Sequence, residues 1–145
     1  MTARGPGRLP AALGGATAVE FALVVGPLLL LLFGVVEVGR LLWTVNAAQE
    51  TAIAGARCMG VLNTSCASGG AYSASSTSSY VRQVASSWGL SLTSANVALN
   101  NSASCAGLAG FSQVTITYRF QSVVPLITTL TGDPLTATAC FPNQS

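Results

Sequence analysis

The chain has 145 residues, is half apolar and carries charge on only 7% of its residues, a balance that favours a membrane-linked or secreted protein of one domain. Its net charge of +2 is spread too thinly to form a basic patch, so we expect no nucleic-acid partner. Histidine is absent and no paired carboxylates suggest acid–base chemistry, so we expect no enzyme, no catalytic residue, no metal and no cofactor.

The N-terminal segment combines positive charge with a long apolar stretch. Arg4 and Arg8 precede this stretch without any acid, and residues 17–38 supply the roughly 20 apolar residues that one membrane crossing needs. Because positive flanks stay on the cytoplasmic side, we expect a cytoplasmic N-terminus and an extracytoplasmic C-terminal part. A conventional signal peptide fits less well, because the small Gly-Gly pair precedes the apolar run and no A-x-A site closes it.

Glu20 is an acid at the mouth of this apolar stretch. A charge at the centre of a membrane helix costs roughly 2.5 to 3.5 kcal/mol, and less near the edge. One interpretation is that Glu20 simply lies among the lipid headgroups. The other is that it pairs with a cation, and cleavage after Gly15 would create one, the free amine of Ala16, four residues before Glu20.

The string GGATAVEFALVVGPLLLLLFGVVEVGRLLW, starting at Gly14, places a glycine, then a glutamate, then an aromatic residue ahead of the span. This order resembles the cleavage motif of type IV prepilins, and the string is similar to the TadE-like pseudopilins of the tight-adherence (Tad, Flp, type IVb) pilus system. The resemblance implies that residues 1–15 are a leader, cut by a prepilin peptidase between Gly15 and Ala16. It further implies that Glu20, followed by Phe21, meets the new amine in its own or a neighbouring subunit.

Beyond the span, the pattern remains helical, so we expect one long helix over residues 16–60. Pro27 is expected to kink it, and Glu37 and Arg40 are spaced to pair on one face. Two ladders of small residues recur every fourth position: Gly14, Ala18, Ala22, Gly26 and Ala48, Ala52, Ala56, Gly60. Each ladder could receive another helix; alternatively, the second packs on the chain's own C-terminal part.

The rest of the chain predicts a Ser/Gly-rich loop over 61–79 and a small extracytoplasmic α+β head over 80–145. Ser79 could cap a short helix that ends near Trp88. Strands are expected at 94–100, at 114–121, where apolar and polar residues alternate, and at 135–141. Pro125 would end the second strand, and a Gly132-Asp133-Pro134 turn would precede the third. The fold class is therefore α+β: a long transmembrane helix carrying a pilin-like antiparallel sheet and one short helix.

Four cysteines are present, at 58, 66, 105 and 140, without any C-x-x-C pair. Their even number beyond a membrane segment indicates disulfides in an oxidising compartment. Sequence leaves three pairings open. We favour Cys58 with Cys66, a local loop, and Cys105 with Cys140, which would tie the long strand to the last one.

Two functions follow from these features. The resemblance implies a minor pilin or pseudopilin of the bacterial inner membrane, because the head is larger than that of the short major Tad pilins. Its partners would be a prepilin peptidase, other pilins and pseudopilins, inner-membrane pilus assembly proteins and membrane lipid. The alternative is an extracytoplasmic binding or adhesion module held by an ordinary signal or membrane anchor.

Overall fold

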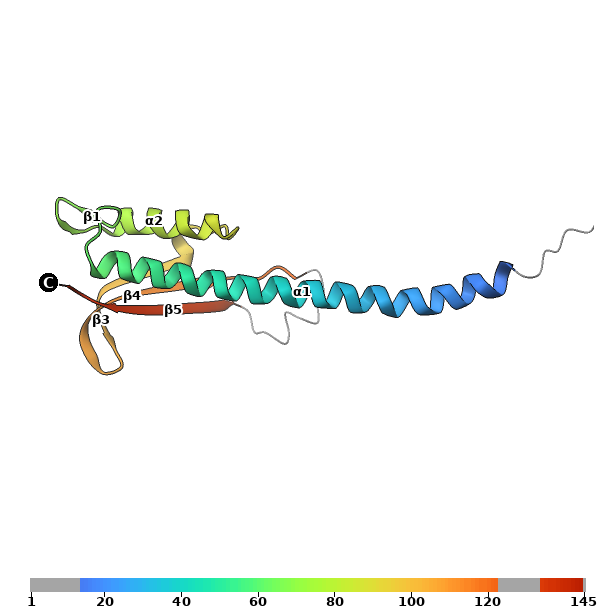
Figure 1. The fold of residues 1–145 in the computed structure, drawn as a ribbon. Helices are drawn as coiled ribbons and strands as arrows, with labels where there is room; N and C mark the ends of the chain where they lie inside the picture. The colour runs from blue at the N-terminus through green and yellow to red at the C-terminus, as the bar shows by residue number, and fades with distance from the viewer. Residues whose placement is uncertain (1–13, 123–133, 145) are drawn as a thin grey trace, which may run out of the picture. The chain divides into compact units, whose positions relative to one another are not determined.

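The computed structural model describes residues 14–122 and 134–144. The predictions for Arg4, Arg8, Pro125 and the Gly132–Asp133 part of the turn lie outside these residues. The fold is α+β as predicted, with a long apolar helix, a second short helix and antiparallel strands (Figure 1). The chain divides into two compact units, Met1–Val36 and Glu37–Ser145.

Helix α1, Gly14–Gly60, is 47 residues long and belongs to both units. It continues through Pro27, which a membrane helix tolerates because neighbouring groups can satisfy the freed backbone. In the first unit its large apolar side chains are exposed, Leu30 by 76% and Leu23 by 70%. Thr17–Gly60 is a candidate membrane span by length and composition, and its most apolar window has no buried residue. A contiguous apolar surface of this kind marks a segment that meets lipid or a partner.

In the second unit, α1 provides the largest share of the hydrophobic core. Ala48, Ala52 and Ala56 are at most 4% exposed, so the second small-residue ladder packs on the chain's own head. Ala18 and Ala22 of the first ladder are exposed. Small side chains let the other elements approach the helix axis closely. The buried core residues are Ala47, Ala48, Ala52, Ala56, Met59, Val81, Ala85, Leu90, Val114, Ile116, Ala137 and Ala139.

Three strands form an antiparallel sheet in the order β3-β4-β5. β3 is Val97–Cys105, β4 is Leu108–Tyr118 and β5 is Leu135–Pro142. The last strand is confirmed almost residue for residue. β4 begins earlier than predicted and ends at Tyr118 rather than at residue 121.

The first predicted strand begins three residues too early, because Ser94–Asn96 form a short 3-10 helix, η1. Its capping box uses the side chain of Asn96, which accepts a hydrogen bond from the backbone N–H of Thr93 at 2.9 Å. The Asn96 amide also donates to the carbonyl of Thr117 at 3.0 Å, which fixes this turn against β4. Local side-chain bonds of this kind compete with extended structure.

The predicted loop over 61–79 contains a small hairpin. Strands β1, Ala67–Ser68, and β2, Ala71–Tyr72, pair around Gly69 and Gly70. Both glycines have positive φ, 62° and 82°, as a two-residue hairpin turn requires. The Gly-Gly pair was therefore a turn signal within a segment that composition alone marks as a linker.

The loop prediction is also wrong at its end, because helix α2 spans Ala74–Ser87 and begins five residues before Ser79. Ser73 is the cap, and its hydroxyl accepts from the backbone N–H of Ser76 at 3.4 Å. Thr77 explains the earlier start: it is fully buried, and its one hydroxyl hydrogen is shared between the carbonyl oxygens of Ser73, at 2.8 Å, and Cys66, at 3.3 Å. Thr77, Val81 and Ala85 thus form the buried face, whose first member is polar.

Gly55 of α1 is required by close packing. A Cβ added there would lie 2.7 Å from Val81 Cγ2 and 3.3 Å from Val114 Cγ2, and both valines are fully buried. We expect Gly55→Ala to lower the free energy of unfolding by about 1–3 kcal/mol through overpacking. Gly39→Ala is the matched control, because its added Cβ meets nothing within 4 Å and alanine favours helix by up to about 1 kcal/mol. Denaturant unfolding of both variants in detergent should give changes of opposite sign; a stabilised Gly55→Ala would contradict this packing.

Candidate processing and assembly site

The four residues expected to act in processing and assembly lie in the first two turns of α1. Gly15, Ala16, Glu20 and Phe21 are all helical. Because residues four apart share a helix face, Glu20 lies one turn beyond Ala16 on the same face. Gly15 is exposed, and a Cβ added there would meet nothing within 4 Å. The backbone around the expected cleavage position is therefore not covered by other described parts of the chain.

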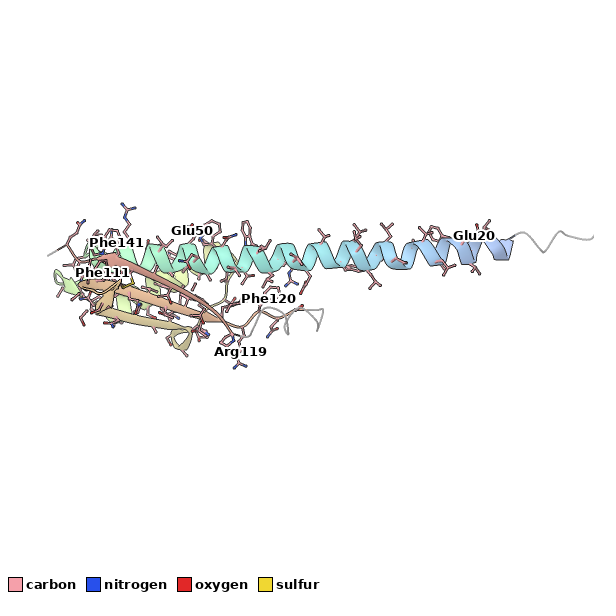
Figure 2. All side chains as sticks on the ribbon, turned by 90° about the horizontal axis from the view of Figure 1, so that it is seen from below. Glu20, Glu50, Phe111, Arg119, Phe120 and Phe141 are labelled. Carbon is pink, nitrogen blue, oxygen red and sulfur yellow. A yellow bond between two sulfur atoms is a disulfide. The ribbon has the colours of Figure 1, made fainter. Side chains whose placement is uncertain are left out.

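Glu20 is exposed on an otherwise apolar surface (Figure 2). Its neighbours Val19 and Phe21 are 61% and 69% exposed, and Leu23 and Val24 are exposed to a similar degree. Within residues 14–122 and 134–144, the salt bridge that forms does not involve Glu20. A carboxylate among lipid-facing side chains is stabilised only by a counter-charge or a polar interface.

The other acid of the apolar stretch, Glu37, is neutralised within the chain. Its Oε2 lies 3.0 Å from Nη1 of Arg40, which confirms the predicted pair. Glu37 is 4% exposed, whereas the Arg40 side chain is 53% exposed and its guanidinium lies 5.8 Å from the centroid of the Phe120 ring. The two acids of the apolar stretch thus differ: Glu37 has its cation in this chain, whereas Glu20 forms no salt bridge among the described residues.

Both disulfides favoured from the sequence are present. Cys58–Cys66 fastens the last turn of α1 to the segment before β1. Cys105–Cys140 joins the two outer strands of the sheet, β3 and β5, across β4. Among the described residues, no group of three or more His, Cys, Asp or Glu could hold a metal ion.

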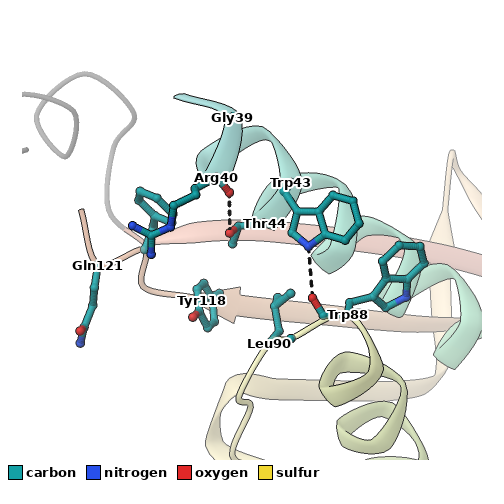
Figure 3. A pocket seen from close by; sticks show the side chains of 10 residues that line it. Gly39, Arg40, Trp43, Thr44, Trp88, Leu90, Tyr118 and Gln121 are labelled. Atoms are coloured by element: carbon teal, nitrogen blue, oxygen red, sulfur yellow. Dashed lines mark hydrogen bonds between the residues drawn. The ribbon is translucent and has the colours of Figure 1, made fainter. Parts of the chain in front are cut away.

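An aromatic cluster was missed by sequence reasoning. Trp43 of α1 and Trp88 at the end of α2 have ring centroids 5.7 Å apart, and the Trp43 indole donates to the Trp88 carbonyl at 3.2 Å. With Tyr118 and Phe120 of the β4 end they line a cavity of about 660 Å³, which Arg40 also borders (Figure 3). A signal existed for Trp43, which directly follows the apolar stretch, but its partners are 45 or more positions away.

Comparison with known proteins agrees with the N-terminal geometry. Residues 15–57 match the model of the TadE-like protein family. This match includes the four residues expected to act in processing and assembly and ends just before Cys58, so it covers most of α1 and none of the β-sheet. No curated protein and no solved structure matches the chain. The long N-terminal helix, but not the head, is therefore similar to the TadE-like protein family.

Proposed function

We propose that the protein is a minor pilin or pseudopilin that acts in Tad pilus biogenesis after a prepilin peptidase removes residues 1–15. The new chain begins at Ala16, and its amine pairs with Glu20 of the same or a neighbouring subunit. Hydrophobic helices then pack side by side, while this pair sets their register. The head contributes contacts outside the membrane.

The observation that carries the proposal is the difference between Glu20 and Glu37, the two acids in the apolar stretch of α1. Glu37 has a cation 3.0 Å away, whereas Glu20 lies on an exposed apolar surface four residues after the expected new amine. Processing would supply the missing charge at a helix N-terminus, where the helix dipole also favours a carboxylate. An ordinary membrane anchor has no need for an acid at this position.

The proposed location is the bacterial inner membrane, with one crossing, a cytoplasmic N-terminus and a periplasmic head. Arg4 and Arg8 support this orientation by the positive-inside rule. Two disulfides in the head agree with an oxidising compartment on that side. The proposed partners are the prepilin peptidase, other pilins or pseudopilins and the inner-membrane pilus assembly proteins.

Mapping the mature N-terminus tests the proposal directly. We expect mass spectrometry of the membrane fraction to find a chain that begins at Ala16. Gly15→Leu should leave the precursor uncut, whereas Gly26→Leu should be processed normally; added Cβ atoms at both glycines meet nothing within 4 Å, so neither change alters the described packing.

Two results would contradict the prepilin proposal. One is a membrane-bound chain that retains Met1 in the presence of an active prepilin peptidase. The other is a chain that begins beyond residue 45 and is released to the medium, which would favour the secreted or tethered adhesion module instead.

A further inference from the structure

The aromatic cavity of the head lies next in the chain to the apolar segment. Its α1 residues, Gly39–Thr44, follow the expected span of 17–38 without a break in the helix. At a rise of about 1.5 Å per residue, they lie within roughly 10 Å of the end of the span. The headgroup layer on one side of a bilayer is about 5–8 Å deep, because the whole bilayer is about 40–45 Å thick and its hydrocarbon core about 30 Å, so these residues lie within that layer or directly outside it. The cavity is therefore positioned at the membrane surface, provided that the proposed membrane insertion is correct.

The side chains of the cavity have the character of a membrane interface. Trp43 is 58% exposed and Trp88 38% exposed, although large aromatic rings in a water-soluble head are normally covered. Trp and Tyr gather where a bilayer meets water, because their rings are apolar and their N–H or O–H groups remain polar. Leu42, which precedes Trp43, is also 57% exposed.

The two tryptophans come from different elements and are held as a unit. The indole hydrogen bond of Trp43 to the Trp88 carbonyl and the tilted ring contact join α1 to the end of α2 (Figure 3). Trp43 directly follows the apolar segment of α1. The link therefore holds Trp88, 45 positions further along the chain, next to the end of that segment. A membrane contact at Trp43 alone would need no such partner.

Arg40 supplies a cation at the edge of the cavity. Its Nη1 bonds Glu37, and a guanidinium has five N–H donors in all, so the ion pair leaves donors for an anion. The pair and the ring of Phe120 beneath the guanidinium hold it in place. Arginine binds phosphate well because its donors form a planar fork.

We propose that this cavity seats the headgroup of a membrane phospholipid. Arg40 contacts the phosphate, while Trp43, Trp88 and Tyr118 pack against the glycerol and the upper acyl chain. The bound lipid holds the head against the membrane surface. This proposal rests on the proposed membrane insertion but not on cleavage at Gly15.

The chain offers a direct test because Trp43 and Trp88 are its only tryptophans. The full chain is reconstituted into phosphatidylethanolamine–phosphatidylglycerol vesicles whose acyl chains carry bromine either near the carbonyl end or near the bilayer centre. In Trp43→Phe, where Trp88 alone reports, we expect an intensity loss of about twofold from the shallow bromine and little from the deep one. Trp88→Phe reports Trp43 and should show the same order.

Variants of arginine test the phosphate contact. Arg40→Gln should weaken the quenching of Trp88, whereas Arg82→Gln should not, because Arg82 is exposed on α2 and bonds only residues of its own helix among the described contacts. Arg40→Lys keeps the charge next to Glu37 and should retain most of the quenching. Unchanged Trp88 quenching in a folded Arg40→Gln would overturn the phosphate contact.

Photolabelling of the unaltered chain avoids any question of misfolded variants. A phospholipid with a photoreactive headgroup is expected to label residues 88–90 and 118–121 as well as 39–44. Labels confined to 39–44, or Trp88 untouched by either bromine in chains that float with the vesicles, would overturn the lipid site alone. Trp88 could instead be protected from an aqueous quencher only when the vesicles hold many copies of the protein. That result would overturn the lipid site and indicate that a second copy of the chain covers the cavity. Chains that do not float would overturn the membrane anchor itself.

Discussion

Glu20→Ala is expected to reduce assembly of the subunit with other pilins by at least about a hundredfold, while leaving its membrane insertion intact. If Glu20 pairs with the amine of Ala16 out of water, removing the carboxylate leaves that amine unpaired, and breaking such a pair costs about 3–5 kcal/mol. Each 1.4 kcal/mol or so corresponds to a tenfold change in an equilibrium constant. Insertion should not suffer, because the change removes a charge from the apolar segment.

Glu50→Ala is the matched control for this prediction. Glu50 is an exposed glutamate on the same helix, in the part that belongs to the head (Figure 2). Crosslinking of membrane fractions measures assembly, and carbonate extraction measures insertion. Glu20→Gln separates charge from hydrogen bonding, since it keeps an acceptor for the amine. Normal crosslinking of Glu20→Ala, or equal losses in Glu20→Ala and Glu50→Ala, would contradict a pairing role for Glu20.

The long helix and the last strand were predictable from sequence because each follows one strong local pattern. Residues 21–36 are all uncharged and mostly apolar, and in lipid a helix is the structure that lets such a segment satisfy its backbone groups internally. β5 follows the period of two, with Ala137 and Ala139 inward and Thr136 and Thr138 outward. Neither prediction needed to know what the segment packs against.

The start of α2 could not be placed in this way. Several serines between residues 73 and 79 satisfy the chemistry of a cap, so the choice of Ser73 depends on tertiary contacts. The decisive one is Thr77, whose hydroxyl bonds the carbonyl of Cys66 at 3.3 Å. Because Thr77 is polar, a search for apolar periodicity does not detect it as the first residue of the buried face of α2.

The two parts of the candidate site also differ in whether their residues are close in sequence or are brought together only by folding. Gly15, Ala16 and Glu20 are close in sequence, so their order alone predicted a processing site. The aromatic cavity draws on α1, α2 and β4, and its members become neighbours only when these elements pack. Trp43 carried a local signal as an interfacial residue, but nothing local to Trp88 or Tyr118 links them to it.

Removal of the Cys105–Cys140 disulfide is the change expected to destabilise the head most. The bridge closes a loop with a sequence separation of 35, compared with 8 for Cys58–Cys66. On the chain-entropy model these separations correspond to about 3.8 and 2.5 kcal/mol of stabilisation at 25 °C. Such amounts are large against the 5–15 kcal/mol or so by which a whole domain is stable.

The location of this bridge adds to the expected effect. β5 forms an outer edge of the sheet, and its pairing with β4 must be reached through the long connection after Tyr118. With the Cys105–Cys140 bridge intact, β5 remains tethered to β3 even when its hydrogen bonds open. Without the bridge, β5 can separate fully from the sheet, and this separation exposes Ala137 and Ala139 of the core. We therefore expect β5 to become the first element to exchange its amide hydrogens.

The double variant Cys105→Ser/Cys140→Ser is compared with Cys58→Ser/Cys66→Ser as its matched control, so that neither variant carries an unpaired cysteine. Denaturant unfolding of the full chain in detergent, followed by fluorescence of Trp43 and Trp88, measures the free energy of unfolding in each. We expect the first variant to be less stable than the second by about 1 kcal/mol. A greater loss in Cys58→Ser/Cys66→Ser would mean instead that fastening the end of α1 to the hairpin stabilises the head more than closing the sheet does.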